Sequence, residues 1–240
     1  MVRPGGSGRG VKVHRAFADR PTPVIRRVAL TGTGRLADDV YLLAHHEVTG
    51  RPLLQPRAAG LGLAGALLVE LAMIGAVRMA ADGCAVTGRV RPQDGLTRSV
   101  QLRMLGERQR HAARDWLAFL AQSAEADVAR RLAGAGYLVR AESRRPWGAA
   151  RWVPADPDCA FAPVIRLKAA LDPIRPAALE STVLAGLAVA CGLGPRVLPY
   201  GPPGARRELA ERVRLLGPDL RELISQTQAA VDSAVLAHRL

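Results

Sequence analysis

The longest apolar run in the chain, GLGLAGALLVELAMIGAV over residues 60–77, contains one charged side chain, Glu70. Three interpretations compete: the G-x-G-x-x-G glycines suit a dinucleotide-binding turn, the length suits a membrane span, and the leucines and alanines suit a core helix. A dinucleotide-binding turn follows a β-strand, whereas Gln55-Pro56-Arg57 precedes these glycines. Placing an acid such as Glu70 in a bilayer would cost about 2 to 3 kcal/mol on insertion scales. We therefore expect a core helix, with Glu70 held by an arginine or a backbone group.

The spacing of apolar residues predicts helices along most of the chain. The first, over residues 36–44, opens with the acidic pair Asp38-Asp39, because carboxylates in a first turn favour the helix dipole. We expect the HHE cluster at residues 45–47 to be a solvated helix end, since adjacent positions do not share a helical face. Further helices are expected between residues 96 and 135, the last closed by Gly136, and over residues 158–171, 176–193, 205–216 and 219–238.

Two segments have the pattern of β-hairpins. VRMAADGCAVTGRV, residues 77–90, places Asp82-Gly83 where a tight turn requires a positive φ. YLVRAESRRPWGAARWVPAD, residues 137–156, interleaves arginine and tryptophan along two arms, with its tip near residues 146–148. With 49% hydrophobic but only 4% aromatic residues, the core must be built from Leu, Val and Ala, which favours packed helices.

The sequence therefore predicts a mostly α fold, a single compact helical domain with one or two short β-hairpins over residues 34–240. Residues 1–33 are rich in Gly, Pro and Arg, and we expect a flexible basic N-terminal arm there. The arm lacks an apolar segment of the secretory kind, so we expect the protein to stay in the cytoplasm. Cys84, Cys159 and Cys191 are far apart in the sequence, and we expect buried thiols and no metal site.

The formal net charge of +13 comes from arginine, because Lys12 and Lys168 are the only lysines among 34 basic residues. A field this positive attracts phosphate groups, on a membrane or on nucleic acid. The chain lacks a Walker lysine, a nucleophile elbow and an H-E-x-x-H motif, and a second glycine motif, GTGRLA at residues 32–37, lacks the parallel strand that a nucleotide fold needs. We therefore expect no catalysis and no cofactor.

Two segments, LADDVYLLAHHEVTGRPLL and GLGLAGALLVELAMIGAV, resemble the Golgi phosphoprotein 3 family, whose bacterial members carry D-D-x-Y-L-L-A-H, then T-G-x-P, then G-x-A-G-A-x-L-x-E-L-A. The resemblance implies a helical domain without catalytic activity. It also implies a peripheral membrane protein that binds phosphatidylinositol 4-phosphate in a basic pocket, inserts an apolar hairpin into the bilayer and holds the tails of membrane enzymes. The pocket's Trp and Arg correspond here to Gln55 and Ala64, and its two further arginines to Gln122 and Glu125.

The side chains that remain to contact anionic lipid headgroups are arginines, joined by tryptophans that prefer the membrane interface. They are Arg57, Arg130, Arg131, Arg144, Arg145, Trp147, Arg151 and Trp152. A hairpin whose tryptophans pack on the protein body is the competing interpretation.

We expect a non-enzymatic peripheral membrane protein on the inner face of the membrane, with a membrane-enzyme client or a homo-oligomer as further partners. The alternative is a protein-protein adaptor or an oligomeric scaffold that does not bind lipid. Nucleic acid is not an expected partner, because the chain has no helix-turn-helix, RNP sequence or set of stacking aromatics.

Overall fold

A computed structural model describes residues 33–141, 151–172 and 177–238, which form ten α-helices, one short 3-10 helix and two β-hairpins. In chain order the elements are α1 (Leu36–Leu43), α2 (Pro56–Met73), β1 (Val77–Ala80), β2 (Gly83–Val86), α3 (Gly95–Gly106), α4 (Ala113–Leu120), α5 (Ala124–Gly134), β3 (Leu138–Ala141), β4 (Arg151–Pro154), α6 (Pro157–Leu171), α7 (Leu179–Ala190), α8 (Gly194–Val197), η1 (Leu198–Tyr200), α9 (Ala205–Arg214) and α10 (Pro218–His238). The predicted fold class is confirmed. Residues 1–32 of the expected arm lie outside the described residues.

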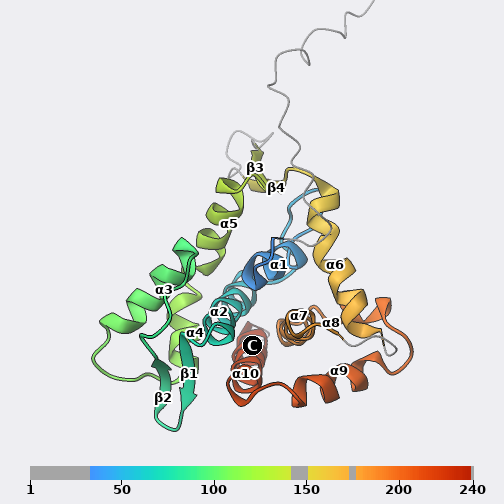
Figure 1. Ribbon diagram of the computed structural model, residues 1–240. Helices are drawn as coiled ribbons and strands as arrows, with labels where there is room; N and C mark the ends of the chain where they lie inside the picture. Colours follow the sequence, from blue (N-terminus) through green and yellow to red (C-terminus); the bar gives the residue numbers. More distant parts are fainter. Residues whose placement is uncertain (1–32, 142–150, 173–176, 239–240) are drawn as a thin grey trace, which may run out of the picture.

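Helix α2 is the core helix of the domain. Figure 1 shows α1, α2, α7 and α10 gathered at the centre, with α3, α4 and α5 on one side and α6 and α9 on the other. Helix α2 contacts α1, α4, α5, α7 and α10, and Leu63, Leu67 and Leu68 on it are fully buried. It is the helix, among the described residues, that is long and apolar enough to cross a membrane, but most of it is buried inside the protein.

The glycines of the G-x-G-x-x-G motif lie within α2, at points where neighbouring elements approach its backbone. A Cβ at Gly60 would lie 2.6 Å from the carbonyl oxygen of Ala121, where α4 ends. A Cβ at Gly62 would collide with the thiol of Cys191, and one at Gly65 with Thr227 of α10. These glycines therefore allow close helix packing, and their spacing does not mark a nucleotide-binding turn.

Both predicted hairpins form as antiparallel pairs. Strand β1 pairs with β2 from Val77 opposite Val86 to Ala80 opposite Gly83. Strand β3 pairs with β4, so that Arg140 lies directly opposite Trp152. Figure 1 shows the two hairpins at opposite ends of the side formed by α3, α4 and α5. The tip of the second hairpin, near residues 146–148, lies outside the described residues.

One local sequence interpretation is confirmed and another is wrong. Asp38 and Asp39 lie in the first turn of α1, as expected, although only 2% and 0% of their surfaces are exposed. His45 does not lie in a solvated helix end: it is buried, stacked on Tyr41, and its Nδ1 lies 2.8 Å from the Tyr41 carbonyl oxygen. Asp38 and Asp39 pair with arginines on α5 and α6, and the His45 Nε2 lies 3.5 Å from a carboxylate oxygen of Glu125 on α5. Local sequence patterns do not reveal such distant partners. For the cysteines, Cys84 and Cys191 are buried as expected, whereas Cys159 is half-buried.

Candidate functional site

The β3–β4 hairpin carries two of the predicted lipid-contact residues that the structure describes, Arg151 and Trp152. Val139, Arg140 and Arg151 are exposed, while Trp152 is partly buried and packs against the core. Strand pairing places Arg140 directly opposite Trp152 on one face of the hairpin, while Arg151 and Val139 project from the other face. The predicted residues Arg144, Arg145 and Trp147 lie outside the described residues.

The turn between α1 and α2 packs against this hairpin. Gly50 has a φ of +61°, and a Cβ there would collide with the carbonyl oxygen of Trp152. The turn is closed by hydrogen bonds from the Gly50 N–H to the His46 carbonyl, 2.8 Å, and from the His46 N–H to the Arg51 carbonyl, 2.9 Å. Because the turn lies so close to β4, its own exposed side chains sit beside those of the hairpin.

Together these segments give one end of the molecule both exposed apolar side chains and arginines. Val48 is 60% exposed, Leu53 40% and Val139 48%. Arg51 on the turn and Arg57 on the first turn of α2 are also exposed. We call this region the hairpin end and define it as the described residues 46–57, 138–141 and 151–154.

The start of α2 adds a partial positive charge to the hairpin end. Its N-cap residue, Gln55, makes no side-chain cap, and its first turn contains no acidic residue. The backbone N–H groups at such a helix start lack partners within the helix and attract anions. Arg57 therefore lies on a helix end that itself favours negative charge.

The two arginines predicted on α5 have different environments. Arg130 is exposed, with 73% of its side chain accessible, and its Nη1 pairs with Asp127 at 2.8 Å. Arg131 has 8% of its side chain exposed and points into the protein. Its prediction as a surface residue is therefore corrected, because its guanidinium is engaged by carboxylates in the interior.

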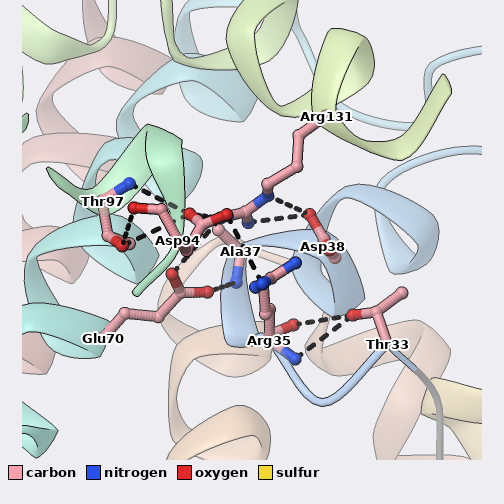
Figure 2. Close-up of polar contacts among 8 residues, drawn as sticks. All are labelled: Thr33, Arg35, Ala37, Asp38, Glu70, Asp94, Thr97 and Arg131. Atoms are coloured by element: carbon pink, nitrogen blue, oxygen red, sulfur yellow. Dashed lines mark hydrogen bonds and ion pairs between the residues drawn. The ribbon is translucent and has the colours of Figure 1, made fainter. Parts of the chain in front are cut away.

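Arg131 is the centre of a buried ionic cluster, drawn in Figure 2. Its Nε and Nη2 contact Oδ1 of Asp38 on α1, at 2.8 and 2.7 Å. Its Nη1 donates to Oδ2 of Asp94, at 2.7 Å, and lies 3.6 Å from Oε2 of Glu70 on α2. Asp94 is also the N-cap of α3, since it accepts from the Thr97 N–H at 3.0 Å, and Arg35 lies 3.5 Å from its other oxygen. The cluster thus links α1, α2, α3 and α5.

Burial sets the protonation of these carboxyl groups. Desolvation raises the pKa of Asp38 and of Glu70 above their ordinary values, although Arg131 lowers both. The pKa of Asp94 lies below its ordinary value: burial acts to raise it, but the hydrogen bond from the Thr97 N–H and the charge of Arg131 together outweigh burial. A neighbouring pair, Asp39 with Arg166 of α6, lies beside the cluster, and desolvation raises the pKa of Asp39 to about 7.

These groups stabilise one another and hold the helices in place. A hollow of about 250 Å³ lies beside the cluster, lined by Leu36, Met73 and Ile74 as well as by Glu70 and Arg166. Glu70 and Arg166, which line it, already have partners within the protein. We therefore assign the cluster a structural role and place the candidate functional surface at the hairpin end.

A sequence signal for the cluster exists. Asp39 lies three positions after Leu36 and four before Leu43, so all three share one face of α1, and that face is buried. The helix dipole explains why acids favour the first turn of α1, whereas the spacing places Asp39 on its buried face. For Arg131 no local signal exists, because its partners lie 37 and 93 positions away.

The fold and the hairpin end define a class of protein: a helical domain wrapped around one apolar core helix, with a basic hairpin at one end. A family model for Golgi phosphoprotein 3 (GPP34) matches residues 36–236, and the chain therefore belongs to the Golgi phosphoprotein 3 family. No curated protein matches the chain. The resemblance found in the two sequence segments is confirmed.

Proposed function

We propose that this protein is a non-enzymatic peripheral membrane protein that binds anionic lipid headgroups through its hairpin end, on the cytoplasmic side of a membrane. The observation that carries the proposal is that one hairpin exposes two arginines, Arg140 and Arg151, together with the apolar side chain of Val139. Apolar side chains enter the interface while arginines meet phosphate, and the two effects add. Membership of the Golgi phosphoprotein 3 family and a net charge of +13 support the same function.

The proposed recognition is by charge more than by headgroup shape. The family's phosphatidylinositol 4-phosphate pocket has an arginine where this chain has Ala64, which is fully buried inside α2. Gln55, where the family has tryptophan, is exposed at the α2 N-cap. Neither side chain supplies a cation, so phosphatidylinositol 4-phosphate should bind here through its charge, as other anionic lipids do.

Vesicle co-sedimentation tests the proposal with the full-length protein. The vesicles contain neutral lipid alone, neutral lipid with phosphatidylserine, or neutral lipid with phosphatidylinositol 4-phosphate at matched charge. Each basic residue at an anionic surface contributes about 1 kcal/mol, so Arg140→Ala/Arg151→Ala should weaken binding by roughly thirtyfold. The matched control is Arg103→Ala/Arg114→Ala, two exposed arginines on α3 and α4.

The proposal expects binding to both anionic vesicles, little binding to neutral ones, and a large loss only in the hairpin variant. A strong preference for phosphatidylinositol 4-phosphate at matched charge would contradict recognition by charge. Absence of binding to all three vesicles would remove the lipid function, and the protein-protein adaptor would then be the better account.

A further inference from the structure

A second basic surface lies away from the hairpin end, between the β1–β2 hairpin and the outer side of α3. Three adjoining hollows form it. The first, of about 220 Å³, lies between Val90 and α3. The second, of about 540 Å³, lies over β2 and shares Val90 with the first. The third, of about 220 Å³, shares Leu105 with the first and Arg110 with the second. We call this continuous surface the α3 furrow.

The α3 furrow exposes apolar side chains that nothing in the described structure covers. Leu102 is 57% exposed, Leu105 50% and Val90 36%. Arg98, Leu102 and Leu105 are spaced by four and three positions, so they share one face of α3. The opposite face of the helix packs against the core through Val100 and Met104. The face of α3 that points away from the core therefore carries both apolar and charged side chains, Leu102 and Leu105 beside Arg98.

The α3 furrow also carries an excess of positive charge. Six arginines line its hollows: Arg78, Arg89, Arg91, Arg98, Arg108 and Arg110. Arg110 pairs with Asp82 at 2.7 Å, and Arg78 lies 3.8 Å from Asp219. The other four have no ion pair among the described residues. Their guanidinium groups are therefore available to a partner that brings carboxylates.

We propose that the α3 furrow docks an acidic segment of another protein, whose aliphatic side chains enter the hollow between Val90 and Leu105 while its carboxylates pair with Arg91 and Arg98. Charge complementarity favours an acidic partner, and the run of three adjoining hollows along α3 favours an extended peptide. A bilayer surface would contact projecting residues and leave the hollows empty. A single-stranded nucleic acid would stack its bases on exposed aromatics, whereas Trp116, the aromatic that lines the third hollow, is 5% exposed. Duplex DNA would contact the arginines through its phosphates but would leave the exposed leucines uncovered.

This binding surface is independent of the lipid proposal, because the α3 furrow and the hairpin end share no residue. Figure 1 shows α3 and the β1–β2 hairpin well separated from β3 and β4. A protein held to a membrane by its hairpin end would keep the α3 furrow open to a protein partner. The two surfaces can therefore be tested with separate variants of the same chain.

The test uses the full-length protein on an array of immobilised 12-residue peptides. The number of Glu and Asp residues and the number of Leu, Ile and Val residues vary independently, and matched peptides carry Lys in place of Glu. Affinities for the best acidic peptides are then measured in solution. Arg91→Glu/Arg98→Glu and, separately, Leu102→Ser disrupt the α3 furrow. The control Arg103→Glu/Arg114→Glu changes the net charge equally at two exposed sites that line none of the hollows.

The proposal expects binding that requires both acidic and aliphatic residues in the peptide. The double arginine variant should bind at least about tenfold more weakly and the control within about threefold of the original protein. Leu102→Ser should also weaken binding, with thermal unfolding unchanged. The proposal is overturned if acidity alone decides binding, if the control loses as much as the furrow variant, or if no peptide binds. Vesicle or duplex DNA binding that is lost with the furrow arginines would overturn it as well.

Discussion

The carboxylate of Glu70, in the last turn of α2, accepts a hydrogen bond of 2.8 Å from the backbone N–H of Ala37 at the start of α1. Helix α1 has no cap of its own, because its N-cap residue Arg35 makes no side-chain cap hydrogen bond. A residue 33 positions away therefore caps it. Glu70 is also the residue that makes the apolar run of residues 60–77 a poor membrane span. Its role in the fold explains why a charged residue occurs in so apolar a helix.

Replacing Glu70 should separate its two roles. Glu70→Gln retains an oxygen acceptor for the Ala37 N–H but removes the charge that faces Arg131. Glu70→Ala removes both and leaves a small cavity, so we expect it to lower the free energy of unfolding by about 3 kcal/mol and Glu70→Gln by less than half of that. Urea unfolding followed by circular dichroism measures both. Equal losses in the two variants would show that the cap contributes little.

Adjacent positions on α5 offer a second comparison. Arg131→Met leaves Asp38, Glu70 and Asp94 without their shared cation, so the free energy of unfolding should fall by about 3 to 5 kcal/mol. Arg130→Met removes only an exposed ion pair with Asp127, so it should change the free energy of unfolding by less than about 0.5 kcal/mol. Similar values for the two variants, measured by the same unfolding experiment, would be incompatible with a buried ionic cluster around Arg131.

The buried pair of Asp39 and Arg166 predicts a pH dependence of stability. Burial raises the pKa of Asp39 to about 7 from an ordinary value of 3.8. Between these values the folded protein holds a proton that the unfolded chain has lost. The free energy of unfolding should therefore decrease as the pH rises through this window, by up to about 1.4 kcal/mol per pH unit, and the contribution of Asp39 should be constant above it.

Asp39→Asn isolates this contribution, because Asp38 and Glu70 titrate in both proteins while position 39 no longer does. The stability of the original protein relative to the variant should fall from about pH 4 to about pH 7. Urea unfolding across that range gives the difference directly. Two parallel curves would mean that Asp39 stays ionised in the folded protein.

Gly50 should be needed to dock the hairpin. Gly50→Ala puts a Cβ against the carbonyl of Trp152 and also strains a positive φ. Gly136→Ala, at φ +83° with nothing within 4 Å, introduces the strain without the collision. We expect Gly50→Ala to speed amide hydrogen exchange in β3 and β4 and Gly136→Ala to leave exchange in β4 unchanged. Equal effects of the two variants on β4 would show that the contact does not hold the hairpin.

Periodic apolar residues and turn signals predicted most of the fold. The run around Glu70 gave the core helix, and Asp82-Gly83 gave the first hairpin at its observed position. Both signals are local, because helix periodicity and turn geometry act over a few residues. The expected partner of Glu70 was also found, as both a backbone N–H and an arginine.

The functional surfaces could be predicted only in part. Arg140 and Trp152 lie opposite each other because of strand pairing, which the interleaved sequence already indicated. The buried position of Arg131 depends on carboxylates from α1, α2 and the N-cap of α3. The sequence alone therefore does not show that Arg131 points inward while its neighbour Arg130 points to solvent. The α3 furrow was not predicted, because it depends on how β2 and α3 pack together.

Amide hydrogen exchange of the full-length protein, with and without vesicles, tests the central claim most directly. On vesicles with phosphatidylserine, peptides covering residues 46–57, β3 and β4 should exchange more slowly than in the free protein. Peptides from α3 should be unchanged, and neutral vesicles should have no effect. Protection of α3 with the hairpin end unprotected, or equal protection on neutral vesicles, would contradict an electrostatic lipid contact at the hairpin end.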